Sequence, residues 1–600
     1  MTRKNDPSLP FGGGPLFFVR ALCAFLIAFL ALALFQDGVN PVYAIALGAL
    51  LTVLYGKLRF CREKRRLAVV SGIFSFLFSC SLFLGTKIDS ATGECFAYTK
   101  FDLLYLPALC LALFPCVFLL LEYLSGSGRL PLAASRPFDE KRPHRFALIA
   151  AGLIFLCYLF TYLCYFPAVS TYDTWVVLAQ ASHITPLSDW HPFLYTLLMR
   201  VFTGHSLWSL QTGIALFAFL QMLFMALCAG YTVLWMLKKR LHWAFAALTA
   251  LYYALPPLFA TFAVSLWKDI PFAAAVLLYS LCLYDLLESK GQTLRTLKGV
   301  LRYILLTFLT GILRHNGFYI VLVVSAVLLV YFIVKQKKES LRLLPVLLAA
   351  VALTPIVNQT AYALGVEKGP SSEAMSIPAQ QIARTYVSGG NITPEQREQL
   401  ALYFDLDMLR EYDPFLADPA KNSMDKEYFD ANKGGFLQLW FSLMGSNLET
   451  YVQAYLLQTH GYWHIGDKPE SIVFPTANEL SEVGIEKKNL LGRGTLIQFW
   501  ESTTQPYDFI SIGTLVWVML LCAAILLIRK QYTRLITLLP VLGVWGTTMI
   551  AAPTSCSYRY MYALLLAVPL ILFLAVAKSG TVSDVTPSPH EPGQQAKSPQ

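Results

Sequence analysis

Four short stretches of this chain combine acidic, basic and imidazole side chains next to long apolar runs. They are YDTW with Asp173, continued by SDWHP with Asp189 and His191; SLWKDIP with Lys268 and Asp269; RHNG with Arg314, His315 and Asn316; and SYRYMY with Arg559. Ionisable groups are expensive to hold near lipid without partners, and proteins that keep them there generally use them. We therefore predict that the four stretches form one site.

Asp173 is the acid expected to act in this site. A carboxylate here can serve as a general base on the hydroxyl group of an acceptor, a role that typically contributes about 10² to 10⁴ in rate. The alternative is that Asp173 only caps the helix that follows the turn from Ser170 to Thr174. Spacing alone does not separate these two interpretations.

The basic residues of the four stretches suit phosphate. An arginine such as Arg559 on the outer side runs against the positive-inside bias, and its planar fork matches phosphate oxygens. Lys268 and Asp269 could contact a phosphate or a metal, or could be a snorkelling cation beside a helix-capping carboxylate. The alternative for RHNG is a polar hairpin tip closed by Gly317, and for the tyrosines around Arg559 it is anchoring at the membrane interface.

Two further polar motifs lie in a long hydrophilic segment. Gln381 and Arg384 in SIPAQQIART are candidate substrate-binding residues. His460 and His464 in QTHGYWHIG have a metal-compatible spacing, but Gly461 weakens a helical reading, and we assign no metal ligand. The sequence has no G-x-x-x-x-G-K-[ST] loop, HExxH or paired CxxC, which disfavours an ATP-driven machine. The cofactor stays open between none and a divalent metal ion.

The elements that must position these residues are membrane helices. Of the 600 residues, 56% are hydrophobic and 14% are charged. Apolar runs of roughly 17 to 25 residues recur, and each can cross a hydrocarbon core as a helix. Lipid offers no hydrogen-bond partners, and a single helix makes all its backbone hydrogen bonds within itself. We predict an all-α polytopic membrane protein with about fourteen transmembrane helices. They lie near 15–35, 41–56, 67–84, 102–123, 146–166, 207–236, 241–262, 271–287, 299–314, 317–334, 341–357, 509–528, 535–552 and 559–577.

Charge gives these helices an orientation. Lys and Arg gather in alternate loops, for example 57–66 and 238–240, while the other short loops carry few. The net charge of +10 therefore sets topology and does not indicate a nucleic-acid partner. We expect a multi-pass protein of the cell membrane with both termini in the cytoplasm, which places all four polar stretches on the outer face.

The predicted organisation has five parts. Residues 1–145 form a four-span region with basic cytoplasmic loops, and 146–357 form a seven-span core with a functional external loop at 167–206, of which 192–202 lies along the membrane surface. Residues 358–508 form an extracytoplasmic, mostly helical soluble domain. Residues 509–577 add three spans, and 578–600 form a disordered cytoplasmic tail.

The layout of residues 146–577 resembles the GT-C superfamily of membrane glycosyltransferases, which includes protein mannosyltransferases and aminoarabinose transferases. More narrowly, YDTWVVLAQ, HPFLYTLLMR, WKDIPFA, RHNG and SIPAQQIAR together resemble an uncharacterised bacterial family of multispan proteins with such an architecture. The resemblance implies a catalytic acid in the first external loop of the core, here Asp173. Many mannosyltransferases of the superfamily carry two adjacent acids, whereas Asp173 is flanked by Tyr172 and Thr174.

The function implied by this resemblance is sugar transfer. The donor is a sugar on a polyprenyl-phosphate carrier, and the acceptor is an extracytoplasmic glycan, lipid or protein of the cell envelope, with inversion at the sugar. A transporter or lipid flippase is the main alternative, and it predicts midplane charges and internal repeats, which the sequence does not display. A non-catalytic membrane protein with a ligand-binding outer domain is the third interpretation.

Overall fold

The computed structural model describes residues 15–35, 39–58, 61–126, 142–170, 173–467, 485–492, 494 and 511–577. Within these ranges the chain is helical, and extended backbone pairs only in isolated bridges. The all-helical class predicted from the sequence is confirmed for this part of the chain. The predicted tail at 578–600 lies outside the described residues, as do parts of the predicted outer domain at 468–484 and 495–510.

Eight helices in the described ranges are long and apolar enough to cross a membrane. A ninth span results if α9 (Trp243–Ala254) and α10 (Pro257–Val264) count as one, bent by 58°. Consecutive prolines at 256 and 257 explain the break, because proline cannot continue a helix without losing a backbone hydrogen bond. The eight are η1–α3 (Arg62–Gly85), α4 (Asp102–Ser125), α5 (Arg142–Cys164), α8 (Leu210–Lys238), α11 (Asp269–Glu288), α13 (Asn316–Lys335), the Leu343–Ala363 part of α14 (Lys337–Ala363) and α25 (Tyr558–Val576).

The larger number of spans expected from the sequence is not shown. Several expected spans coincide with apolar helices that are shorter than a full crossing. They include α1 (Pro15–Ala33, with Phe17–Ala33 apolar and fully described), α2 (Pro41–Lys57), α22 (Ile512–Ile528) and α24 (Leu539–Ile550). Composition marks these stretches as apolar; α2 and α22 have 17 residues each, α24 has 12, and α1 has 17 residues in its fully described part.

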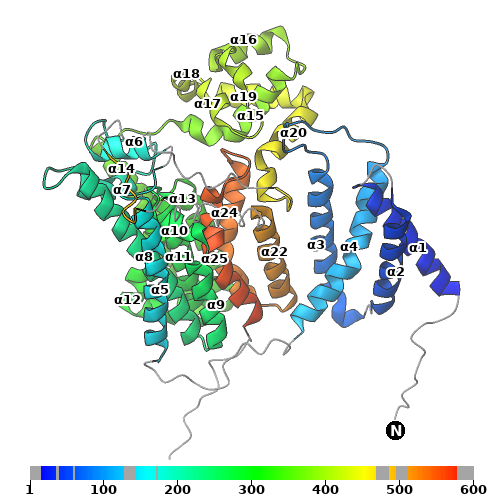
Figure 1. The fold of residues 1–600 in the computed structure, drawn as a ribbon. Helices are drawn as coiled ribbons and strands as arrows, with labels where there is room; N and C mark the ends of the chain where they lie inside the picture. Colours follow the sequence, from blue (N-terminus) through cyan, green and yellow to red (C-terminus); the bar gives the residue numbers. More distant parts are fainter. Residues whose placement is uncertain are drawn as a thin grey trace, which may run out of the picture.

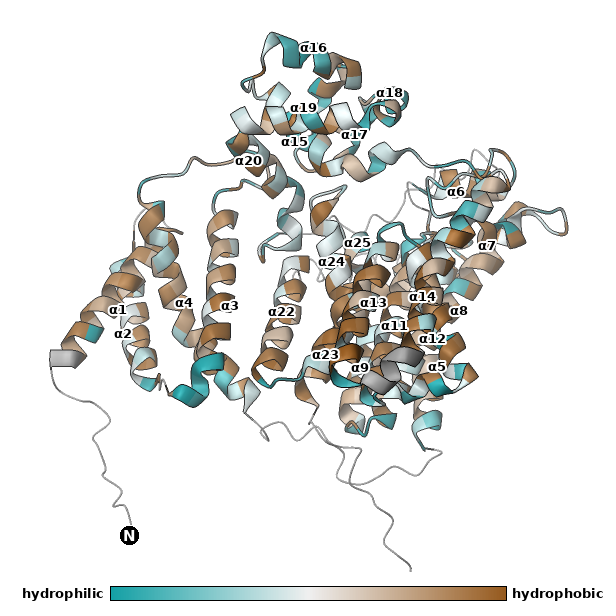
Figure 2. Cartoon of the chain, turned by 180° about the vertical axis from the view of Figure 1, so that it is seen from behind, coloured by the Kyte–Doolittle hydropathy of each residue, from teal (hydrophilic) through white to brown (hydrophobic). Residues whose placement is uncertain are grey.

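The membrane helices form a main bundle with a smaller group beside it. Helices α1 to α4 stand at one side, and α22 packs against both α3 and α25 and so joins the two groups (Figure 1). Hydrophobic residues run along the bundle helices, while α16 and α18 carry many hydrophilic ones (Figure 2). Within the bundle α11 is the most enclosed span, with 83% of its apolar window buried, followed by α25 with 72%. Asp269 begins α11, and Arg559 lies in the first turn of α25.

A group of short helices caps one end of the bundle (Figure 1). They pack around a hydrophobic core of their own that includes Ile382, Leu400, Phe436 and Leu443. Thr393 and Gln396 form a reciprocal capping box at the start of α16, in the NITPEQ sequence. The group consists of η3 (Ser371–Met375), α15 (Ser376–Val387), α16 (Pro394–Tyr403), η4 (Met408–Glu411), α17 (Asp418–Asn422), α18 (Lys426–Ala431), α19 (Lys433–Ser446), α20 (Leu448–Thr459) and η5 (His460–Tyr462). We call it the outer helices.

Charged residues mark the two ends of α11. Asp269 begins the helix, while Asp285 near its other end pairs with Lys239 at 2.9 Å and Arg302 at 3.0 Å. At 1.5 Å per residue, these two acids lie about 24 Å apart along the axis. The network at Asp285 ties α8, α11 and α12 (Leu297–Ile312) together, away from the outer helices.

Candidate functional site

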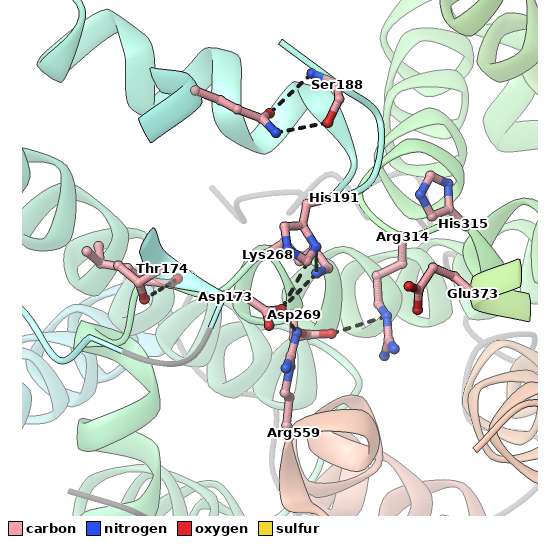
Figure 3. A network of polar contacts seen from close by, with 12 residues as sticks. Asp173, Thr174, Ser188, His191, Lys268, Asp269, Arg314, His315, Glu373 and Arg559 are labelled. Atoms are coloured by element: carbon pink, nitrogen blue, oxygen red, sulfur yellow. Dashed lines mark hydrogen bonds and ion pairs between the residues drawn. The ribbon is translucent and has the colours of Figure 1, made fainter. Parts of the chain in front are cut away.

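Each of the four predicted stretches contributes at least one charged residue to a single cluster of Asp173, Lys268, Asp269, Arg314 and Arg559 (Figure 3). Lys268 Nζ lies 3.1 Å from Asp173 Oδ2, and the Arg559 guanidinium contacts the same oxygen through Nη2. Arg559 Nε also lies 2.7 Å from Asp269 Oδ2, and Arg314 Nε lies 3.1 Å from Asp269 Oδ1. Residues separated by up to 386 positions in the chain thus form one ion-pair network.

Backbone pairing brings Asp173 and Lys268 together. The amide of Val169 donates to the carbonyl of Val264 at 3.1 Å, and the amide of Leu266 donates back to Val169 at 3.0 Å. This short parallel pairing places the residues that follow each segment side by side. Asp173 occupies the N-cap position of α6 (Thr174–Ala181), but its side chain makes no capping hydrogen bond. Its carboxylate points instead to the cations, so capping does not account for this residue.

The outer helices hold the loop that leads into Arg559. The amide of Ala417 donates to the carbonyl of Pro553 at 2.8 Å, and the amide of Ser555 donates to the carbonyl of Phe415 at 2.8 Å. Because α25 begins at Tyr558, this pairing fixes the start of the helix on which Arg559 sits. The position of the arginine therefore depends on the outer helices as well as on the bundle.

Aromatic rings cover the two arginines. The Cζ atom of Arg559 lies 5.1 Å from the ring centre of Trp267 and 5.3 Å from that of Tyr560, and the Cζ atom of Arg314 lies 5.1 Å from Tyr560. These contacts stabilise a cation that is shielded from water. Sequence reasoning did not assign Trp267 or treat Tyr560 as more than an interfacial anchor. The sequence did carry a sign of this role, because Trp267 directly precedes Lys268 and Tyr560 directly follows Arg559.

His191 joins the network as a neutral ring. Its Nδ1 atom lies 2.6 Å from Lys268 Nζ and 3.9 Å from Asp173 Oδ2. Burial and the nearby Lys268 charge lower the pKa of His191 to about 3. The neutral ring accepts a hydrogen bond from the ammonium group through Nδ1, which leaves its proton on Nε2.

The electrostatics of Asp173 follow from its cations. Burial alone would raise the pKa of Asp173, but the charges of Lys268 and Arg559 outweigh it and lower that pKa far below its usual value. Burial lowers the pKa of Lys268, and Asp173 opposes that effect. With Lys268 protonated and His191 neutral, three cations face two carboxylates. The network carries one net positive charge.

Two buried hydrogen-bond donors in this network lack an acceptor. Trp267 Nε1 and Arg314 Nη1 are both inaccessible to solvent and make no hydrogen bond with any residue that the structure describes. Buried donors are nearly always paired in native proteins, so each unpaired donor calls for an explanation. Together with the net positive charge, they make the site suited to an oxyanion such as phosphate.

Asp189 has a different position from the one expected of a substrate ligand. It is buried, accepts the hydroxyl of Tyr362 at 2.6 Å, and accepts the amide of Phe193 at 3.3 Å at the start of α7 (Phe193–Thr203). His315 Nε2 lies 3.1 Å from the Asp189 carbonyl oxygen. Asp189 and His315 therefore fix the loop that carries His191. Tyr362 was not anticipated, because nothing in its sequence neighbourhood indicates a partner so far away.

The remaining predicted residues lie outside the ion-pair network. Asn316 Nδ2 donates to Thr547 Oγ1 at 2.8 Å and links α13 to α24. Gln381 lies inside the outer helices, where its Nε2 donates to the carbonyl of Tyr451 at 3.1 Å. Arg384 lies there too, with Nη2 at 3.2 Å from Gln453 Oε1. The structure does not bring Gln381 or Arg384 to Asp173.

His460 and His464 share a carboxylate. Asp467 Oδ2 lies 3.1 Å from His464 Nδ1, and Asp467 Oδ1 lies 3.6 Å from His460 Nε2 and accepts the Ser90 hydroxyl at 2.9 Å. Ser90 belongs to the loop between α3 and α4, so this cluster connects the N-terminal helices to the outer helices. Across the described ranges, no group of three or more His, Cys, Asp or Glu side chains is arranged to hold a metal ion.

Comparison with known proteins gives one match. A family of unknown function, DUF6020, matches residues 180–587, which is more than half of the chain. The chain belongs to this family. The matched region contains His191, Lys268, Asp269, Arg314 and Arg559, and it begins just after Asp173. No curated protein and no solved structure matches the chain.

Proposed function

We propose that this member of the DUF6020 family is a glycosyltransferase of the cell membrane with a GT-C-like core at 146–357. It transfers a sugar from a polyprenyl-phosphate carrier to a hydroxyl group of an extracytoplasmic acceptor, with inversion at the sugar. In this proposal about fourteen apolar segments cross or enter the bilayer, and both termini lie in the cytoplasm. The polar network then faces the outer side, where the acceptor is found.

The observation that carries the proposal is the convergence of one reachable acid and three cations. The Asp173 side chain is 21% exposed, whereas that of Asp269 is 1% exposed. Asp173 is therefore the carboxylate that a substrate can touch, and Asp269 serves to hold Arg314 and Arg559. Glycosyl transfer from a phosphate carrier needs this combination, a base for the attacking hydroxyl and positive charge for the departing phosphate.

The reaction divides these tasks among named residues. Asp173 accepts the proton of the acceptor hydroxyl as the oxygen attacks the anomeric carbon. The bond between that carbon and the phosphate oxygen breaks, and its electron pair leaves with the lipid phosphate. Arg559, Lys268 and Arg314 stabilise the growing negative charge, an effect worth roughly 10²–10³ in rate for one well-placed donor. Attack from the face opposite the leaving group inverts the sugar.

The residues around Asp173 also bear on whether this site could hold a metal ion. A divalent cation bound to either oxygen of Asp173 would lie close to the positive charges of Lys268 and Arg559, which contact Oδ2. Like charges at such separations repel strongly in a shielded site. The residues present therefore do not fit a divalent metal ion at Asp173, and the proposed mechanism routes no step through one.

The test compares a strain that lacks this gene with strains that carry the wild-type gene, Asp173→Asn or Asp102→Asn. Asp102 is a matched control, a buried acid paired with Lys87 at 2.8 Å outside the site. Mass spectrometry of lipid-linked sugars and surface polymers should show accumulated donor and unmodified acceptor in the deletion and Asp173→Asn strains only. Full restoration of the acceptor by Asp173→Asn would refute the proposal.

A further inference from the structure

Asp173 concentrates its contacts on a single oxygen. Among the described residues, its Oδ2 atom faces Lys268 Nζ at 3.1 Å and His191 Nδ1 at 3.9 Å, and it accepts a hydrogen bond from Arg559 Nη2. Both cations therefore point at the carboxylate. In this arrangement the carboxylate sits where a bound phosphate oxygen would have to sit.

This arrangement conflicts with the proposed role of Asp173 as a base. A base is most effective when its pKa lies near the working pH, and a carboxylate held by two cations is a weak base. The cations are engaged as well, since carboxylate and phosphate oxygens compete for the same charge-assisted hydrogen bonds. An N–H group that donates to Asp173 is not free to donate to the phosphate.

We propose that Asp173 occupies the phosphate site of the resting protein and that the phosphate of the donor displaces it, so that donor binding frees the base. This inference rests on the proposed function. It requires the lipid phosphate to bind before the acceptor hydroxyl can be deprotonated.

The two carboxylates differ in their freedom to move. Asp269 is 1% exposed and is held by Nε of Arg314 and Nε of Arg559, so it keeps both guanidinium groups in place. Asp173 is 21% exposed, follows a loop, and makes no hydrogen bond to the α6 backbone. Displacement therefore moves Asp173 and leaves the Asp269 pairs intact.

Displacement has a proton signature. Lys268, Arg559 and His191 face Asp173 directly, Tyr560 on α25 interacts electrostatically with it, and Asp269 on α11 acts on Lys268. Release from the two cations raises the pKa of the carboxyl group toward its ordinary value of about 3.9 or above. Near pH about 4, where a free carboxyl group is partly protonated, binding of a monoanionic phosphate is then accompanied by net proton uptake.

The experiment measures this uptake on the purified full-length protein. Farnesyl methyl phosphate is the probe, because a phosphodiester keeps one charge and does not titrate in this range. Isothermal titration calorimetry in buffers of different ionisation enthalpy gives both affinity and protons bound. We expect the wild-type protein and Asp102→Asn to take up protons. Asp173→Asn should take up no protons. It should bind the probe about tenfold more tightly or better, because no carboxylate at position 173 competes with the phosphate for Lys268 and Arg559.

The outcomes are separable. Binding by the wild-type protein without proton uptake, or Asp173→Asn binding no more tightly than wild type, overturns the displacement alone. Absence of probe binding to every variant refutes the phosphate site and the proposed function with it. Inorganic phosphate is a separate probe that should bind more weakly; equal binding would overturn the lipid assignment. If Asp173→Asn does not fold, the wild-type protein alone tests the displacement: proton uptake on binding supports it, and binding without uptake overturns it.

Discussion

Replacement of Arg559 by lysine tests the geometry of the site most finely. The arginine uses two different nitrogens for two carboxylates, with Nε at 2.7 Å from Asp269 Oδ2 and Nη2 on Asp173 Oδ2. A lysine ammonium is a compact point charge on a flexible stem and does not reproduce this planar fork. Arg559→Lys keeps the charge and loses at least one of the two contacts.

The size of the effect follows from that loss. A hydrogen bond to a charged group contributes roughly 1.5–3 kcal/mol. Because each 1.4 kcal/mol is a factor of ten, a phosphate that loses one such hydrogen bond to residue 559 should bind up to about 150-fold more weakly, offset in part by the weaker competition from Asp173. Arg559→Gln removes both contacts and the charge. It leaves buried carboxylates with fewer partners, which costs about 3–5 kcal/mol in a typical buried pair.

The assay is titration of wild-type protein, Arg559→Lys and Arg559→Gln with farnesyl methyl phosphate, with size-exclusion profiles to establish folding. Arg384→Lys is the matched control, because Arg384 contacts Gln453 within the outer helices. It should bind the probe as wild type does. If Arg559→Lys binds the probe with wild-type affinity, the two contacts of the Arg559 guanidinium with Asp173 and Asp269 do not determine phosphate binding, and the reasoning is refuted.

Three further results are expected. Gly317→Ala should lower thermal stability, because its Cβ would lie 1.9 Å from the Thr310 carbonyl oxygen, while Gly434→Ala, with open space around it, should not. Asp467→Asn should cost roughly 1.5–3 kcal/mol at neutral pH through its lost hydrogen bonds. Burial raises the pKa of Asp467, but His464 and its other partners lower it overall. A lowered pKa in the folded state stabilises the folded protein above the unfolded-state pKa of about 3.9, and this stability is lost as the pH falls through the folded-state pKa. The difference in melting temperature between wild type and Asp467→Asn should therefore vanish at pH values below both pKa values. A pH-independent difference would contradict this.

The sequence predicted the components of the site because their environment is visible in the sequence. An acid or an arginine at the outer end of an apolar run has to find a partner, since lipid offers none. That reasoning selected Asp173, Lys268, Asp269, Arg314 and Arg559, which the structure brings together. Charge alternation predicted that they share one face of the membrane.

The individual contacts were not predictable in the same way. Which oxygen Arg559 reaches depends on the loop held by Phe415 and Ala417, hundreds of residues from Asp173. Asp189 resembled a ligand by its proximity to His191, but its carboxylate is satisfied by Tyr362 and the start of α7. Such pairings arise from packing between distant segments, and no local pattern specifies them.

The polar segment was harder to interpret for a related reason. Gln381 and Arg384 stand out in sequence because they are polar and occur on a short helix. In a group of helices with its own core, buried polar side chains commonly satisfy neighbouring polar groups, as Gln381 does with Tyr451 and Trp440. Spacing does not separate that structural role from ligand binding.

The most direct measurement is sugar transfer by the purified protein in liposomes, supplied with labelled polyprenyl-phosphate sugars and with envelope material from the deletion strain. The wild-type protein should move one sugar to the acceptor fraction with inverted anomeric configuration, and Asp173→Asn should move almost none. Transfer by Asp173→Asn at the wild-type rate, or no transfer by the wild-type protein from any donor of this class, would contradict the assignment of a phosphate-dependent glycosyltransferase.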